Sequence, residues 1–141
     1  MTIKMQTLLE ERARHLLAGD FAAYAAHFLT PLPLFLPDQT VTFTTQSQLI
    51  HFARGLLDSF LERGIVAWRP TIMAQELPRA DRQRLWVRWD EIAADGSISV
   101  SSDCLNYLRK TPQGLRTEMI HWQNLAVQQS CYALQARLKS A

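Results

Sequence analysis

Arg12 falls within an apolar helical stripe, where its charged side chain could hold an anion. In a helix over residues 5–17, with about 100° of rotation per residue, Arg12 falls among the apolar residues Met5, Leu8, Leu9, Ala13 and Leu16. A guanidinium keeps its charge, so burying it without a partner is costly. We therefore expect this face to border a cavity that holds water, an acidic partner or a ligand. The alternative is that the Arg12 stem covers apolar surface while its head group extends into solvent.

His121 is the candidate for proton transfer, because the pKa of an unperturbed histidine lies near neutrality and a cavity can tune it. The alternative is a neutral His121 that is hydrogen-bonded in a cavity wall without any turnover. Cys104 could meet His121 across adjacent strands, where a thiolate would be reactive, but a small buried cysteine is the simpler interpretation. Tyr24 lies at the edge of an apolar helix stripe and could turn its hydroxyl into the same cavity or pack in the core.

Metal and nucleotide chemistry are not indicated by the remaining motifs. His15 and His27 have no partner at the i, i+4 spacing of helical ligands, so no zinc site is predicted. The chain carries no Ser-His-Asp, Walker or GxGxxG pattern. We therefore expect no cofactor.

The charge pattern argues against nucleic acid and membranes as partners. Fifteen basic and thirteen acidic residues give a formal net charge of +2, and the basic residues are scattered rather than gathered in one block. No stretch approaches the ~20 apolar residues of a transmembrane helix, and the first residues lack the apolar core of a signal peptide. Two cysteines without a CxxC pair suit a reducing compartment, so a cytoplasmic location is expected.

Three helices are predicted in the first half of the chain. The first ends at Gly19, a residue type favoured after a helix C-terminus. Asp20 caps a second helix, whose apolar spacing continues to Leu29 before the Thr-Pro pair at 30–31 ends it. The capping box at 45–48 starts a third helix, which has a continuous apolar face including Phe60 and is closed by Gly64.

Strands fill the rest of the chain. Two short strands are predicted over 32–37 and 40–43, and beyond Gly64 a period of two predicts strands over 66–76, 84–93, 97–109 and 115–125. Helical spacing of Val127, Cys131, Leu134 and Leu138 predicts a short C-terminal helix. The order α-α-β-β-α-β-β-β-β plus this helix is typical of an α+β fold. We expect one domain over 1–141, with a core over 1–125 and a helical tail over 126–141.

Three segments together resemble the NTF2-like superfamily, which includes ketosteroid isomerase and the SnoaL-like proteins. They are AGDFAAYAAHF, the capped helix TTQSQLIHFARGLLDSFLERG, and the strand pair SISVSSDCLNYLRKTPQGLRTEMIHW. The resemblance covers residues 1–125 and does not assign a subfamily. It implies a cone, in which a strongly curved mixed sheet wraps around the long helix and leaves a pocket. Function does not follow from this fold, because catalysts and inert binding domains share it.

The catalytic positions of those relatives can be placed on this chain by aligning Gly19-Asp20 and the Gly114 turn. The isomerase's oxyanion-hole tyrosine then falls on Arg12, and its oxyanion-hole acid falls on Asn106, which can donate a hydrogen bond. Its general base falls on Leu36, which cannot accept a proton, while Asp38 lies at a turn where we expect it to be solvated. The acid that SnoaL-like cyclases carry in the last strand is replaced by Gln123. We therefore expect neither ketosteroid isomerase nor polyketide cyclase activity.

Strand alternation divides the sheet residues between a cavity face and an outer face. The cavity face is expected to carry Leu85, Val87, Trp89, Ser102, Cys104, Asn106, Met119, His121 and Gln123. The outer face is expected to carry Trp86, Arg88, Asp103, Leu105, Tyr107, Ile120 and Trp122, with Asp103 as an ion-pair partner of Arg88. Large apolar groups on an outer face usually need a partner, and this superfamily often dimerises there, so a homodimer is expected.

Two functions remain open at this point. The first is a binding domain for a small, partly apolar and anionic molecule. Its expected ligand-binding residues are Arg12, Tyr24, Phe60, Trp89, Cys104, Asn106, Met119, His121 and Gln123. The alternative is a cofactor-free lyase, isomerase or hydrolase, with His121 as acid or base and Arg12 as electrostatic stabiliser. The missing carboxylates favour the binding domain.

Overall fold

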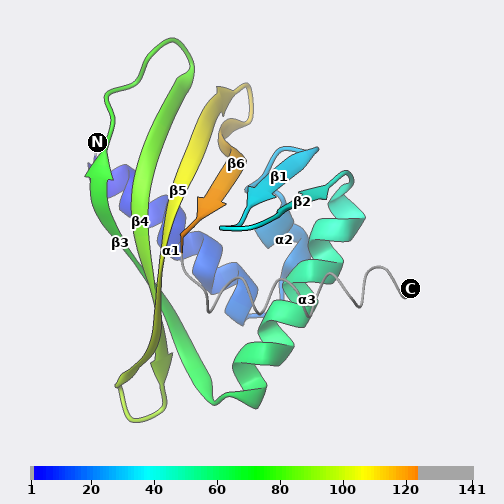
Figure 1. The fold of residues 1–141 in the computed structure, drawn as a ribbon, viewed down its shortest axis with the longest axis vertical. Coiled ribbons are helices and arrows are strands. Elements are labelled where there is room, and N and C mark those ends of the chain that lie inside the picture. The colour runs from blue at the N-terminus through cyan, green and yellow to red at the C-terminus, as the bar shows by residue number, and fades with distance from the viewer. Residues whose placement is uncertain (1, 124–141) are drawn as a thin grey trace.

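The computed structural model describes residues 2–123 and has the predicted order of elements (Figure 1). The helices are α1 (Thr2–Leu17), α2 (Phe21–Ala25) and α3 (Gln46–Glu62), and the strands are β1 (Leu32–Phe35), β2 (Thr40–Phe43), β3 (Ile65–Gln75), β4 (Arg82–Ala93), β5 (Ile98–Thr111) and β6 (Gly114–Trp122). The predicted C-terminal helix and the last residues of the final predicted strand lie outside the described residues. Within residues 2–123, no helix combines the length and the apolar character that a membrane crossing requires.

Local side-chain caps start the second and third helices. An Asp20 carboxylate oxygen accepts a hydrogen bond from the Ala23 amide at 3.2 Å, and the Thr45 hydroxyl accepts one from the Gln48 amide at 3.2 Å. Both caps satisfy amide groups that the first helical turn leaves without a partner. Helix α2 ends at Ala25, four residues before the predicted end at Leu29.

Helix α2 is short because the next residues pair with the last strand instead of continuing the helix. The Leu29 amide donates to the Thr117 carbonyl at 2.8 Å, and the Thr117 amide donates to the His27 carbonyl at 2.8 Å. Phe28 and Thr117 form an isolated parallel bridge. These bonds hold residues 27–29 against β6 and place the Phe28 side chain, which is 4% exposed, in the core.

The sheet is mixed and has the strand order β2-β1-β6-β5-β4-β3. Strand β1 pairs antiparallel with β2 and parallel with β6, while β3 to β6 form an antiparallel meander. Figure 1 shows the strands curving around α1 and α3, which occupy the concave side of the sheet. Buried residues of both helices and of the inner sheet face form one hydrophobic core, which includes Leu9, Leu16, Leu49, Phe60, Leu85, Val87 and Trp89.

A β-bulge in β6 reverses the predicted facing of the residues that follow it. Tyr107 pairs with Met119, whereas the next residue of β5, Leu108, pairs with Thr117, so Glu118 is an extra residue in the ladder. Such a bulge shifts the alternation of side chains by one position. The buried residues beyond it are therefore Ile120 and Trp122, which pair with the buried Asn106 and Cys104.

The predicted facing of β6 is wrong as a result. Met119, His121 and Gln123 do not face the cavity, and Ile120 and Trp122 do not lie on the outer face. Met119 and His121 instead lie opposite Tyr107 and Leu105 on the outer face.

The predicted facing of β4 and β5 is confirmed. Leu85, Val87 and Trp89 are at most 2% exposed, and Ser102, Cys104 and Asn106 are at most 3% exposed. On the outer face, the Arg88 Nε donates to an Asp103 carboxylate oxygen at 2.9 Å, which is the predicted ion pair.

Candidate functional site

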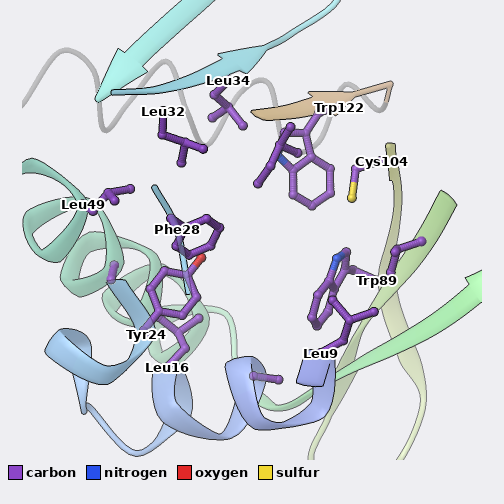
Figure 2. Close-up of a cluster of buried hydrophobic side chains, with 14 of the residues drawn as sticks. Leu9, Leu16, Tyr24, Phe28, Leu32, Leu34, Leu49, Trp89, Cys104 and Trp122 are labelled. Carbon is purple, nitrogen blue, oxygen red and sulfur yellow. The ribbon is translucent and has the colours of Figure 1, made fainter. Parts of the chain in front are cut away.

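A cavity lies between the helices and the inner face of the sheet, and its wall is mainly aromatic and aliphatic. Its volume, measured as the space open to the centres of water molecules, is about 60 Å³. By the same measure, one buried water molecule needs about 10–15 Å³. Its lining residues are Tyr24, Phe28, Leu32, Leu34, Phe43, Leu49, Phe52, Leu56, Phe60, Trp68, Glu91, Ser102, Ile120 and Trp122. Figure 2 shows several of them converging from different elements, with Tyr24 and Phe28 facing Leu32, Leu34 and Trp122.

Few polar side chains line this cavity, and two of them come from neighbouring strands. Glu91 of β4 is 8% exposed, and its Oε1 accepts a hydrogen bond from Nη1 of Arg63, the C-cap residue of α3. Ser102 of β5 is 2% exposed, and its hydroxyl has no hydrogen-bond partner among the described residues. Sequence reasoning missed Glu91, although it continues the inward series Leu85, Val87 and Trp89 by one further step of two.

Arg12 is buried, so the interpretation in which its head group reaches solvent is wrong. Only 2% of the residue is exposed, and Nη1 donates to the Asn106 Oδ1 at 3.1 Å. Nη2 donates to the Thr117 hydroxyl at 2.6 Å, and Cζ lies 4.6 Å from the centre of the Phe28 ring. The prediction that Arg12 lies near Asn106 is confirmed. The guanidinium does not line the cavity itself but lies behind Phe28, which does.

The charge of Arg12 has no carboxylate partner among the residues that the structure describes. None of the ion pairs formed within residues 2–123 includes Arg12, and residues 124–141 contain neither Asp nor Glu. Desolvation lowers the pKa of Arg12, while the nearby Tyr24 and Cys104 oppose this shift. The side chain therefore brings a positive charge next to the cavity, and its partners in the described part of the chain are two neutral hydrogen-bond acceptors and an aromatic ring.

Cys104 is a buried thiol without the reactive partner considered above. It is 3% exposed and pairs with Trp122 rather than His121, so the preferred interpretation of a small buried cysteine is confirmed. The Asn106 Nδ2 donates to the Cys104 sulfur at 3.1 Å, and burial raises the pKa of this thiol to about 12. Cys104 therefore stays protonated at neutral pH and is not an activated nucleophile.

Three of the expected site residues lie away from the cavity in the structure. His121 lies on the outer face with its ring 6.3 Å from that of Phe35, Met119 lies on the same face, and Gln123 is exposed. The predicted position of His121 in the cavity wall is therefore wrong, because the sheet separates its imidazole from the cavity. The predicted positions of Met119 and Gln123 in the cavity wall are wrong as well, because neither residue lines the cavity.

The other expected site residues lie in or directly behind the cavity wall. Tyr24 and Phe60 line it. Trp89 stacks on the lining residue Trp68, with ring centres 4.2 Å apart and planes at 28°. Leu36 is 5% exposed, so the position of the isomerase base is apolar and buried, while Asp38 is exposed as expected.

A second hollow lies where the start of α1 meets the β3–β4 and β5–β6 turns. The space in it that is open to the centres of water molecules is about 440 Å³. Most of its lining residues are exposed, including Lys4, Asp81, Arg82 and Lys110. Because solvent reaches these side chains freely, we take the first cavity, whose lining residues are mostly buried, as the candidate site.

An imidazole pair beside Arg12 was not predicted, because its members come from different elements. The His15 Nδ1 and the His27 Nε2 are 3.2 Å apart. Burial lowers the pKa of His27 to about 3, with smaller contributions from Arg12, His15 and Arg116. Residues 2–123 contain no cluster of three or more His, Cys, Asp or Glu side chains suited to a metal ion.

The depressed pKa of His27 predicts a loss of stability in acid. Because its folded-state pKa lies below the unfolded value of about 6.5, the unfolded chain binds a proton first as the pH falls from about 6.5 towards 3. Between pH 7 and pH 4.5 the free energy of unfolding should decrease in both proteins. We expect the decrease in His27→Gln to be smaller than that in the wild type by about 1–2 kcal/mol. Urea titrations at both pH values measure this difference. The exposed His51→Gln is the control, and an unchanged acid loss in His27→Gln would contradict the assignment.

Comparison with known proteins identifies the fold. No protein-family model matches the sequence, and no curated protein matches it. An NTF2-like protein of unknown function from Shewanella oneidensis is similar, with a TM-score of 0.67 and 13% identity over 87% of this chain and 98% of that chain. A domain of unknown function with a cystatin-like fold from Nostoc punctiforme has a TM-score of 0.68 and 12% identity over 99% and 97% of the two chains.

Aln2 from a Streptomyces species is a further similar structure, with a TM-score of 0.64 and 14% identity over 89% of this chain and 91% of that chain. At these identities the similarity concerns the fold. The chain thus has the predicted NTF2-like, cystatin-like fold.

Proposed function

We propose that the protein binds a small, partly apolar, anionic molecule in the cone cavity. The observation that carries this proposal is the buried guanidinium of Arg12, which has no carboxylate partner within residues 2–123 and lies directly behind the cavity residue Phe28. A ligand anion would supply the missing negative charge without leaving its apolar body in water.

The charges around the cavity favour a single negative charge on the ligand. Glu91 and Arg63 form an ion pair and largely cancel each other, which leaves the positive charge of Arg12. At a separation of about 7 Å and an effective dielectric constant of about 20, two unit charges attract by about 2 kcal/mol. This attraction corresponds to roughly 30-fold in affinity.

The wall and the size of the cavity favour a compact apolar body. Six of the lining side chains are Phe or Trp. Phe28 follows α2, and the other five belong to β2, α3, β3 and β6. The room for several water molecules suits a ligand built on one ring. Apolar walls with a few polar groups are typical of small-molecule sites.

The proposal predicts that a ring carboxylate binds more tightly than its uncharged isostere, and that filling the cavity abolishes binding. We expect wild-type protein to bind 4-methylbenzoate at least about 10-fold more tightly than 4-methylbenzamide in calorimetric titrations. Leu56→Trp, which places a larger side chain at a lining position of α3, should bind neither compound. The control is Leu61→Trp on the same helix, where Leu61 is 66% exposed. Equal affinity for both compounds would contradict the anion, and unchanged binding by Leu56→Trp would contradict the cavity.

We also propose that the outer sheet face joins two copies of the chain in a homodimer. Its apolar residues are Trp86, Leu105, Tyr107 and Met119, because Ile120 and Trp122 belong to the inner face. Arg88 and Asp103 are about half exposed and offer opposite charges to the same residues of a second copy. Aromatic side chains are favoured anchors of such interfaces.

The dimer predicts a measurable change in mass on a single substitution. Tyr107→Glu should be monomeric in light scattering at micromolar concentration, because a charge at the centre of an apolar interface is costly. Leu77→Glu, at an 82% exposed turn position, should stay dimeric. A wild-type protein that is monomeric at high concentration would refute the proposal.

A further inference from the structure

Ser102 has a buried hydroxyl whose hydrogen-bonding capacity is unused. The residue is 2% exposed, it lines the cavity, and its Oγ has no partner among the described residues. Buried polar groups are nearly always satisfied, so an orphaned one that faces a cavity points to water or a ligand as its partner. A hydroxyl can donate one hydrogen bond and accept others.

Glu91 faces the same cavity beside Ser102. Trp89 pairs with Ser102 and Glu91 pairs with Val100, so Glu91 and Ser102 are diagonal neighbours across β4 and β5. Such neighbours have Cα atoms about 7–8 Å apart, which leaves room for one ligand group between their side chains. The Oε1 of Glu91 accepts a hydrogen bond from Arg63. An ionised carboxylate has no proton to donate, so Glu91 can act toward a ligand only as a hydrogen-bond acceptor.

We infer that the ligand carries a hydroxyl group that binds between Glu91 and Ser102, at the end of the cavity away from Arg12. This inference rests on the proposed function and adds a second recognition point to it. The ligand hydroxyl donates a hydrogen bond to the Glu91 carboxylate and accepts one from the Ser102 hydroxyl. Its class is therefore a hydroxylated ring monoanion, with the anionic group at the end formed by Tyr24 and Phe28.

Other polar groups suit this position less well. A carboxylate has no proton to donate, and it would be repelled by Glu91. An ammonium group gains little from Glu91, because Arg63 already neutralises that carboxylate, and it would add to the uncompensated charge of Arg12. A neutral group that both donates and accepts matches the two side chains.

The experiment compares 4-hydroxybenzoate with 4-methylbenzoate, in which a methyl group replaces a hydroxyl group of similar size. We expect wild-type protein to bind 4-hydroxybenzoate about 10-fold more tightly in calorimetric titrations at pH 7, since the hydrogen bonds from Ser102 and to Glu91 together contribute about that much. In Ser102→Ala this preference should fall to about 3-fold or less. Ser101→Ala is the matched control, because the Ser101 hydroxyl donates to Asp90 and does not line the cavity.

The outcomes separate this inference from the proposed function. Equal affinities of the wild type for the two compounds would overturn the hydroxyl site and leave the anion-binding cavity standing. A full preference retained in Ser102→Ala would also overturn it. If the wild type binds neither compound at millimolar concentration, the proposed function itself fails. Ser102→Ala should keep or raise the melting temperature of the ligand-free protein, because it removes an unsatisfied buried hydroxyl, so misfolding does not obscure the result.

Discussion

Trp122→Glu is expected to lower the free energy of unfolding by about 4 kcal/mol or more, whereas His121→Glu should lower it by less than about 1 kcal/mol. Trp122 is 8% exposed and lines the cavity, so the new carboxylate would be buried among apolar side chains. His121 lies on the outer face, where a carboxylate remains solvated. Urea denaturation followed by circular dichroism measures both values.

The comparison of these neighbours is a direct test of the bulge at Glu118. Without the bulge, strict alternation would place His121 inside and Trp122 outside, and the two substitutions would exchange their effects. Equal losses would also contradict the described register. Because Trp122→Glu can fail to fold altogether, Trp122→Phe provides a milder variant, for which a loss of about 1–3 kcal/mol is expected.

Arg12→Met is expected to reduce the affinity for 4-methylbenzoate about 10- to 100-fold while leaving the affinity for 4-methylbenzamide within about 3-fold. The substitution removes the uncompensated positive charge but keeps an unbranched apolar stem. Arg14→Met is the control on the same helix, since the Arg14 side chain is 65% exposed and pairs with Glu11. An Arg12→Met protein that binds the carboxylate as the wild type does would contradict the role of Arg12.

The effect of Arg12→Met on stability should be small compared with its effect on binding. Removing a buried charge relieves its desolvation cost, whereas Asn106 and Thr117 each lose a donor. These opposing contributions keep the expected change in the free energy of unfolding of the ligand-free protein below about 2 kcal/mol. Chemical denaturation without ligand provides this measurement.

The features predicted correctly from the sequence depend either on neighbouring residues, as helix caps do, or on a regular spacing of apolar residues along one helix or strand. The caps at Asp20 and Thr45 each need a side chain and an amide three residues apart. The helical period placed Arg12 on the buried face of α1, and the period of two placed Cys104 and Asn106 on the inner face of β5. Each inference needs only the geometry of one element.

The errors arise where one element responds to another. The alternation of residue types along β6 gives no sign that Glu118 is an extra residue in the ladder. This extra residue turns the side chain of His121 to the other face of the sheet. Helix α2 ends early because Thr117, from the far end of the chain, binds the backbone of residues 27–29. The His15–His27 contact also joins two elements. Glu91 is different, because one further step of the alternation beyond Trp89 predicts that it faces inward.

The parallel pairing of β1 with β6 has a consequence for the order of folding. Leu34 pairs with Ile120, and the side chains of both residues line the cavity. During synthesis the hairpin of β1 and β2 emerges long before its neighbour in the sheet, and closing so long a loop carries an entropic cost that only the complete set of contacts offsets. The meander from β3 to β6 can assemble from contacts nearby in the chain, but the cavity wall is incomplete until β6 docks beside β1. We therefore expect that a ligand bound in the cavity, as proposed, would meet its site only after β6 has docked beside β1, and that it would stabilise the finished fold rather than guide its assembly.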